Sequence, residues 1–241
     1  MAVPGADSIS DPEESTSAPE VPPITGFDIE TDTSTGGLDP NRSAVVATAL
    51  SGDFGDEVIL GSEREILERT DRRLAELGPG LLVTWNGAGF DLPFVEHRAR
   101  VLGLELGLRT TEDPFRRNRR DPARSAVRAR WHDLVHLDGY QLYRADVGRT
   151  LGLPCGLKPL ARLVGLSPVE LDRTTLHTQD IDDVAQYVAS DARIAAELVR
   201  RRMPAALTMA DWPVQRPAGA AGTWGNGDDD GSSLRSRAAR D

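Results

Sequence analysis

Two carboxylates in the first strand-like segment constrain the fold of this chain more than any other feature. Residues 24–31 read ITGFDIET, which is typical of a core strand, and they place Asp28 and Glu30 two positions apart. Side chains at positions i and i+2 point to the same face of a strand. The two acids are therefore expected side by side. A solvated edge strand or pairing with arginine would explain them, and so would the binding of a metal ion.

The following segments predict an α/β fold. Residues 43–52 and 56–61 have the pattern of two further strands joined by a glycine-containing turn, so a three-stranded antiparallel meander is expected. Ser62 and Glu65 form a capping box, which predicts a helix that ends at Gly78. The later elements are expected to be a strand at 80–86, a helix at 91–102, a fifth strand near 129–134, and helices at roughly 135–145, 157–165 and 182–202. This order predicts a mixed central sheet of about five strands, the meander followed by parallel strands, flanked by helices.

Composition separates a folded domain from two tails. Residues 1–23 are rich in Pro, Ser and acids, and residues 213–241 are of low complexity, so both are expected to be disordered. Residues 24–212 then form one domain. This domain carries a net charge of −5, half of the −10 of the whole chain, because the first tail contains five acids and no base. The acidity of the chain therefore does not exclude nucleic acid as a partner.

Membrane and disulfide chemistry are not expected. The sequence holds no run of 18 or more apolar residues, the length that reads as a membrane-spanning helix. Its N-terminus lacks the basic start and apolar centre of a secretory signal. With Cys155 as its one cysteine, the chain can form neither an internal disulfide nor a Cys-based zinc site. A cytoplasmic protein that does not bind membranes is predicted.

A second acidic position follows the predicted buried strand. In VTWNGAGFDLPF (residues 83–94), the strand ends at Asn86, two glycines make a loop, and Asp91 begins a helix. Capping of the helix dipole would explain an acid at this position. The same strand–loop–helix junction is also where α/β sheets place their binding sites.

A third acidic position lies on the last predicted helix, within DIDDVAQYVASDARIAAELVRRR (residues 180–202). Tyr187 and Asp191 stand four residues apart, so they share one face of the helix. Asp191 falls close to the apolar stripe that is expected to pack on the sheet. A buried acid is costly unless it is paired, for example with arginine, or coordinates a metal ion.

Together, the three motifs resemble those of the DEDD 3′–5′ exonucleases, members of the ribonuclease-H-like superfamily. The D-x-E motif corresponds to Asp28 and Glu30, the second acid to Asp91, and Y-x-x-x-D to Tyr187 and Asp191. The sequences FDIET and N-x-x-x-F-D-L-P are most similar to those of the proofreading exonuclease domain of family B DNA polymerases. In this chain the domain is expected to stand alone, without a polymerase domain. The resemblance covers about residues 24–203 and indicates the tyrosine subtype. It implies a ribonuclease-H-like fold and an exonuclease that releases 5′-nucleoside monophosphates from 3′ ends.

The resemblance also implies roles for the four acids and the tyrosine. Asp28 would bridge two Mg²⁺ or Mn²⁺ ions, with Glu30 and Asp191 completing the first site and Asp91 holding the second ion. Two such ions, roughly 3.5–4 Å apart, would activate water and stabilise the leaving oxygen. Hard anionic oxygen ligands suit these metals. Tyr187 would position the attacking water, because a phenol is too weak an acid to act as the base at neutral pH.

Four further residues are candidate substrate contacts. By resemblance, Thr31 and Asn86 would contact the terminal nucleotide or support the site. Phe90 would stack on a base or pack under the helix. Lys158, the sole lysine, would reach a phosphate or remain solvated.

The arginine-rich segment at residues 109–130 is a further candidate. It holds eight Arg against three acids, and is expected to attract the substrate backbone, unless it is only a solvated insertion. Asp133, in RWHDLVHL, would line the cleft or cap a helix.

The expected partner is a single-stranded or frayed 3′ end, with DNA favoured over RNA. Three alternatives stay open: a 3′–5′ exoribonuclease like ribonuclease D, an inactive nucleic-acid-binding module on the same fold, and a Ca²⁺-stabilised structural domain. The sequence offers no sensor of the 2′-hydroxyl that would separate RNA from DNA.

Overall fold

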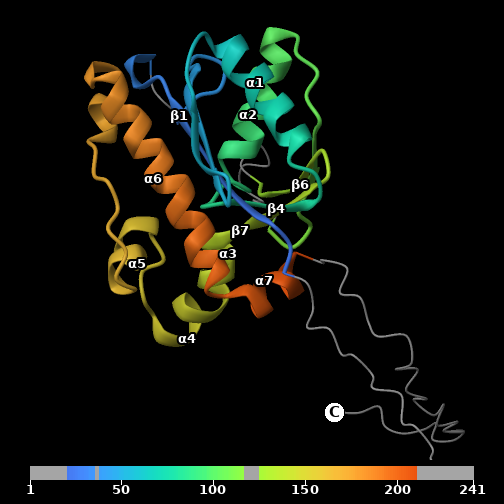
Figure 1. Ribbon diagram of the computed structural model, residues 1–241, viewed down its shortest axis with the longest axis vertical. Helices are drawn as coiled ribbons and strands as arrows, with labels where there is room; N and C mark the ends of the chain where they lie inside the picture. Colours follow the sequence, from blue (N-terminus) through green and yellow to red (C-terminus); the bar gives the residue numbers. More distant parts are fainter. Residues whose placement is uncertain (1–20, 36–37, 117–124, 211–241) are drawn as a thin grey trace, which may run out of the picture. The chain divides into compact units, whose positions relative to one another are not determined.

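The structure of this chain is a computed structural model that describes residues 21–35, 38–116 and 125–210 (Figure 1). Residues 1–20 of the predicted N-terminal tail, the predicted C-terminal tail and residues 117–124 of the arginine-rich segment lie outside the described residues. None of the described helices has the length and apolar character needed to cross a membrane.

The described residues form a mixed sheet of seven strands. The strands are β1 (Ile24–Thr31), β2 (Val45–Gly52), β3 (Gly55–Ile59), β4 (Gly80–Thr84), β5 (Leu108–Glu112), β6 (Val127–Trp131) and β7 (Leu134–Asp138). Their order across the sheet is β3-β2-β1-β4-β7-β6-β5. β1, β4 and β7 are parallel to one another, and the other neighbouring pairs are antiparallel. The predicted meander followed by parallel strands is confirmed.

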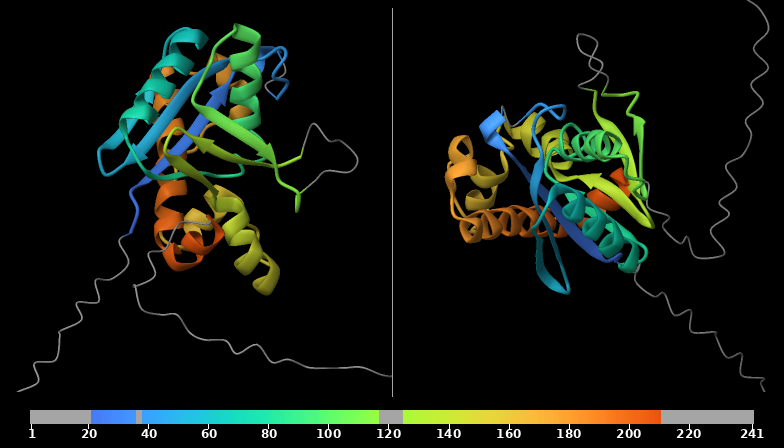
Figure 2. Two further views of the ribbon diagram at one scale, coloured as in Figure 1. Left: turned by 90° about the vertical axis from the view of Figure 1, so that its right-hand side faces the viewer. Right: turned by 90° about the horizontal axis from the view of Figure 1, so that it is seen from above.

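Helices cover both faces of this sheet. The described α-helices are α1 (Glu63–Glu76), α2 (Asp91–Leu102), α3 (Gly139–Tyr143), α4 (Arg149–Leu151), α5 (Leu157–Leu163), α6 (Ile181–Arg200) and α7 (Met203–Met209). α1 and α2 lie on one face, and the long helix α6 crosses the other (Figures 1 and 2). The main core forms under α1 and α2, where Phe27 of β1 meets Trp131 edge to face at 5.5 Å.

The predicted ends of α1 are confirmed. The hydroxyl of Ser62 accepts a hydrogen bond from the N–H of Glu65, and the Glu65 carboxylate accepts one from the N–H of Ser62 at 3.0 Å. These reciprocal bonds satisfy donors that a helix start leaves unpaired. Gly78 follows the helix with a φ of 70°, a left-handed conformation that glycine adopts at little cost.

The prediction of a single strand near 129–134 is wrong. β6 and β7 form a hairpin instead, and β5 pairs with β6 at the edge of the sheet. His132 makes the turn with a φ of 51°, a conformation rare outside glycine. Neither His132 nor Asp133 is a glycine, the residue that marks most two-residue hairpin turns, so the two short strands read as one. The helix expected at 135–145 accordingly begins only at Gly139.

Candidate active site

The parallel strands end at one edge of the sheet. β1, β4 and β7 run in the same direction, so their last residues, Thr31, Thr84 and Asp138, lie toward the same edge. We call it the site edge. Ligands of open α/β sheets bind beyond the carboxyl ends of the strands. The predicted acids are therefore expected near this edge.

Asp28 and Glu30 face the helix α6. Residues paired across an antiparallel ladder share a face of the sheet, and the partners are Ala49 for Asp28 and Ala47 for Glu30. Both alanines are buried in one cluster with Val188 of α6. Glu30 is 4% exposed, and Asp28 is partly buried. The two acids thus share one face, as predicted, and that face is turned toward α6.

The close approach of α6 to β1 shows which part of the helix the acids meet. A Cβ atom on Gly26 would lie 2.0 Å from the carbonyl oxygen of Ala192, so helix and strand touch backbone to backbone at this point. Earlier in β1, Ile24 packs in one cluster with Val199. Helix and strand therefore run in opposite directions. The acids that follow Gly26 face the turns of α6 that precede Ala192.

Tyr187 and Asp191 come from those turns. Tyr187 is 1% exposed and Asp191 is 7% exposed. The ammonium nitrogen of Lys158, near the start of α5, lies 3.6 Å from Asp191 Oδ1 and 3.7 Å from the centre of the Tyr187 ring. It also donates a hydrogen bond of 2.6 Å to the carbonyl of Val169. Lys158 thus belongs to the same site, and the alternative of a solvated side chain is wrong.

Asp91 begins α2 at the end of a tight turn that leaves β4. It is 4% exposed. Within the turn, Asn86 adopts a φ of 70°, and its carbonyl accepts hydrogen bonds from the N–H groups of Gly89 at 3.0 Å and Phe90 at 3.1 Å. Asn86 itself is exposed. The turn therefore buries Asp91 while it presents the predicted substrate contact to solvent.

A buried carboxylate that the sequence analysis missed supports this turn. Asp138, the last residue of β7, is 4% exposed and accepts hydrogen bonds from the N–H groups of Asn86 at 3.0 Å and Ala88 at 3.3 Å. Burial raises the pKa of Asp138, while these bonds and the nearby charge of Arg116 act to lower it. The available signal was an Asp-Gly pair after a buried strand, which is typical of a helix N-cap.

His136 lies two residues earlier and is held neutral. Its Nε2 lies 2.9 Å from Thr84 Oγ1, and this hydroxyl also accepts a hydrogen bond of 3.1 Å from the Gly87 N–H. Either group can be the donor in the bond between the Thr84 hydroxyl and His136, depending on the imidazole tautomer. Although the side chain is partly exposed, loss of ring hydration lowers the pKa of His136 to about 3, with a smaller contribution from the positive charge of Arg116.

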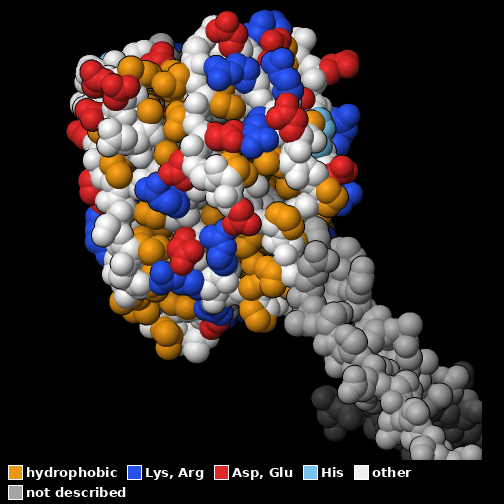
Figure 3. Space-filling model, viewed as in Figure 1, with side chains coloured by type: hydrophobic (Ala, Val, Ile, Leu, Met, Phe, Trp, Pro, Cys, Tyr) orange, Lys and Arg blue, Asp and Glu red, His pale blue; other side chains and the backbone are white. Residues whose placement is uncertain are grey.

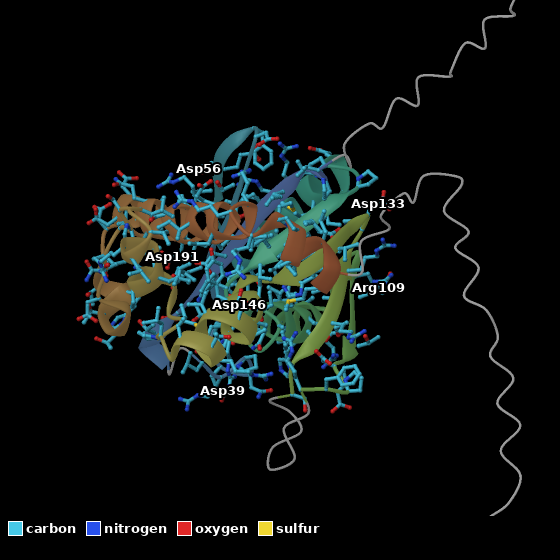
Figure 4. All side chains as sticks on the ribbon, turned by 90° about the horizontal axis from the view of Figure 1, so that it is seen from below. Asp39, Asp56, Arg109, Asp133, Asp146 and Asp191 are labelled. Carbon is cyan, nitrogen blue, oxygen red and sulfur yellow. The ribbon has the colours of Figure 1, made fainter. Side chains whose placement is uncertain are left out.

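The three remaining predicted residues, Thr31, Phe90 and Asp133, lie in surroundings that differ from one to the next. Thr31 ends β1 and is 6% exposed. Phe90 is partly buried and packs on the main core, with its ring 5.3 Å from that of Phe94, as the packing alternative predicted. Asp133 neither lines the site nor caps a helix. It is exposed in the β6–β7 turn, at the opposite edge of the sheet, and on the opposite side from Asp191 in Figure 4.

Part of the arginine-rich segment is the hairpin of β5 and β6. Arg109 pairs with Arg130 and Thr111 with Arg128, so the three arginines share the exposed face of this hairpin. The opposite face packs on the core. At the site edge, Phe115 is 85% exposed, and the Arg128 guanidinium lies 5.7 Å from the centre of its ring. We call Arg109, Arg128 and Arg130 the arginine stripe.

Within the described part of the chain, no three His, Cys, Asp or Glu side chains already form a metal-ligand cluster. The acids are nevertheless candidate ligands for Mg²⁺ or Mn²⁺. Glu30, Asp91 and Asp191 are all more than 90% buried. Carboxylates buried to this extent require cations or hydrogen-bond donors around them, and anionic oxygens are the ligands that these metals prefer.

Comparison with known proteins identifies a related domain. Residues 55–150 match the model of the DNA polymerase family B exonuclease domain. This match includes Asn86 and Asp91 but neither the acids of β1 nor those of α6.

Similar proteins are much longer than this chain. A DNA polymerase of Pyrococcus glycovorans is 29% identical over 68% of the chain and 21% of its own length. The catalytic polypeptide of DNA polymerase epsilon from Aspergillus fumigatus is 34% identical over 54% of the chain and 6% of its own length. The chain thus spans about a fifth or less of these relatives.

A solved structure has the same fold. The family B DNA polymerase of Pyrobaculum calidifontis superposes with a TM-score of 0.63 and 21% identity, over 77% of this chain and 25% of its own. The predicted ribonuclease-H-like fold is thereby confirmed.

Proposed function

Because the chain carries a domain similar to the exonuclease domain of family B DNA polymerases, we propose that it is a 3′–5′ exonuclease that degrades single-stranded or frayed DNA ends. One observation carries the proposal. Asp28 and Glu30 stand on the face of β1 that meets the turns of α6 bearing Tyr187 and Asp191. We propose DNA and not RNA as the substrate because the similar proteins are DNA polymerases.

The proposed chemistry is hydrolysis of the terminal phosphodiester. Asp28, Glu30, Asp91 and Asp191 would hold two Mg²⁺ or Mn²⁺ ions, which when bound would activate water and stabilise the leaving 3′-oxygen. This assignment is supported by the burial of three of these acids.

The other residues would bind the substrate and orient the water. The Tyr187 hydroxyl would orient the attacking water, since the buried ring is held between the helix and the Lys158 ammonium. That ammonium, beside Asp191, would contact the scissile phosphate. Exposed Asn86 would contact the terminal nucleotide.

The arginine stripe offers a path for the rest of the strand. Its three side chains lie on one exposed face, and the hairpin reaches the site edge where Val127 donates a hydrogen bond to the carbonyl of Ala88. Guanidinium groups bind phosphates without reading sequence. Phe115 at the same end would offer a stacking surface for a base.

The test is digestion of 5′-labelled single-stranded DNA and RNA of the same sequence, with Mg²⁺, Mn²⁺ or a chelator. We expect DNA to shorten stepwise from its 3′ end with either metal, and Asp28→Asn to abolish the reaction. Asp133→Asn is the matched control, because this carboxylate lies at the opposite edge of the sheet. Stronger digestion of RNA would indicate an exoribonuclease. Binding of DNA without any cleavage would indicate an inactive binding module.

A further inference from the structure

The turn between β4 and α2 is held by hydrogen bonds from five consecutive backbone N–H groups, three of them to side-chain oxygens. Asn86 is a non-glycine residue at a φ of 70°. A residue in a sparsely populated backbone conformation is costly and persists only where its surroundings compensate. Here the compensation is visible, because each N–H group from residue 86 to residue 90 has an acceptor.

Asp138 provides two of these acceptors. Its Oδ1 accepts from the N–H of Asn86, and its Oδ2 accepts from the N–H of Ala88 at 3.3 Å. The intervening N–H, of Gly87, is bound by the Thr84 hydroxyl. The same Oδ1 caps α3 by accepting from Tyr140 at 3.0 Å and Gln141 at 3.4 Å. One buried carboxylate thus joins the end of β7, the start of α3 and the turn that leads to Asp91.

We infer that Asp138 is a positioning residue for the reaction: it fixes the turn that presents Asn86 to the substrate and places Asp91 at the site edge. The inference rests on the proposed exonuclease function. Asp138 itself contacts backbone of the turn and of α3 in these bonds, and its effect on catalysis is exerted through the two residues that the turn carries. Small displacements of such groups reduce rates strongly, since about 1 Å can cost on the order of 100-fold.

The two oxygens of Asp138 allow the capping role to be separated from the positioning role. In Asp138→Asn, the amide oxygen can take the place of Oδ1 and keep the bonds to Asn86 and to α3. The amide nitrogen then faces the N–H of Ala88, and because it has no lone pair to accept with, this bond is lost. Asn is also as good an N-cap as Asp. Asp138→Ala removes all four bonds.

The first measurement is amide hydrogen exchange of the full chain. We expect the Ala88 amide of Asp138→Asn to exchange at least 10-fold faster than in the natural chain, with the Asn86 amide still protected and the melting temperature nearly unchanged. In Asp138→Ala both amides should exchange faster. An Ala88 amide that stays protected in Asp138→Asn would overturn the inference.

The second measurement separates kcat from KM on 5′-labelled single-stranded DNA. We expect Asp138→Asn to lower kcat by about 10-fold to 100-fold, with KM changed less than threefold. Asp71→Ala is the control. Its carboxylate accepts hydrogen bonds from Trp131 and Gly107 at 2.7 Å, at the edge of the sheet opposite the site edge, so the substitution should destabilise the fold with kcat unchanged. Faster Ala88 exchange with an unchanged kcat would refute the positioning role.

Failure of the two proposals can be told apart. If the natural chain cleaves no substrate, the exonuclease proposal fails by itself. The exchange rates of Ala88 and Asn86 still decide whether Asp138 holds the turn, since they are measured without substrate or metal.

Discussion

Lys158 has the most informative surroundings of any single residue in the site. Its ammonium group lies between the Asp191 carboxylate and the face of the Tyr187 ring, and its side chain is only 16% exposed. A cation in this position offsets the charge of a buried carboxylate and is attracted by the aromatic ring. Under the proposed function, this ammonium group would meet the phosphate of the substrate beside Asp191.

Replacement of this lysine should impair turnover. We expect Lys158→Gln, which removes the charge at similar length, to lower kcat about 100-fold to 1,000-fold, on the scale of losing one electrostatic stabiliser of a transition state. Single-turnover digestion of labelled DNA would measure the effect. Lys158→Arg retains the charge and should recover part of the rate. Equal activity of Gln and Arg variants to the natural chain would show that Lys158 only packs.

At the scale of elements, the proposed site lies between β1 and α6, and the sequence predicts both elements. The two-residue spacing of Asp28 and Glu30 and the four-residue spacing of Tyr187 and Asp191 each place a pair of residues on one face of its element, and the structure has them on that strand and that helix. Asp138 and Asp133 show the limit. The sequence pattern puts the boundary between strand and helix several residues too early, since His132 makes a turn that no glycine marks. The pattern therefore selects Asp133, which lies in the β6–β7 turn, and passes over Asp138, which ends β7 beside the turn that carries Asn86.

The contact between these two elements should tolerate no added side chain at Gly26. In Gly26→Ala the new methyl would lie 2.0 Å from the Ala192 oxygen and would push α6 away from β1. We expect the free energy of unfolding to fall by at least about 3 kcal/mol, beyond the usual range for overpacking. Urea unfolding would measure it. Gly89→Ala is the control, because there the nearest atom is 3.5 Å away. A loss of under about 1 kcal/mol at Gly26 would contradict the close approach.

On the scale of the whole molecule, basic side chains gather on one exposed hairpin although the chain has a net charge of −10. Acidic and basic side chains are interspersed on the face over α6 and α1 (Figure 3). Three of the four candidate carboxylates are buried, and the arginine stripe lies exposed on the outer hairpin. A negatively charged strand would thus be attracted to the hairpin before it meets the acids.

This arrangement predicts how substrate binding depends on salt. For single strands, the slope of log affinity against log salt is about −0.7 per phosphate contact. The double variant Arg128→Ala and Arg130→Ala loses two such contacts. Its slope should therefore be less steep by about 1.4, and its affinity for the strand should be lower. Fluorescence anisotropy with labelled single-stranded DNA at several NaCl concentrations would measure both. Arg72→Ala, on the exposed surface of α1, should change neither. An unchanged slope in the double variant would exclude the stripe from the binding path.

The stability of the whole domain should depend on pH through His136. Its folded pKa of about 3 lies below the ordinary value of 6.5, so the unfolded chain takes up this proton first as the pH falls. The stabilisation is complete above about pH 7 and declines as the pH falls below 6.5. The raised pKa of Asp138 acts in the opposite sense. Comparison with a variant that lacks the imidazole therefore isolates the contribution of His136.

Urea unfolding between pH 5 and pH 7 would test this. Between pH 7 and pH 5, the free energy of unfolding of the natural chain should fall by about 1–2 kcal/mol more than that of His136→Gln. This is less than the full pKa shift of His136 implies, because its side chain is partly exposed. Parallel curves for the two proteins would show that His136 is not held neutral by the fold.

The packing of α6 against β1 also has a consequence for synthesis of the protein on the ribosome. The acids of β1 are made early, whereas Tyr187 and Asp191 are made more than 150 residues later. At about 5–20 residues per second, on the order of 10–30 s separate the two events. During that interval the strand has no helix to cover the face that carries Asp28 and Glu30. The four acids of the proposed site can therefore come together only once α6 has left the ribosome, so the proposed exonuclease would gain its activity after synthesis of the domain and not during it.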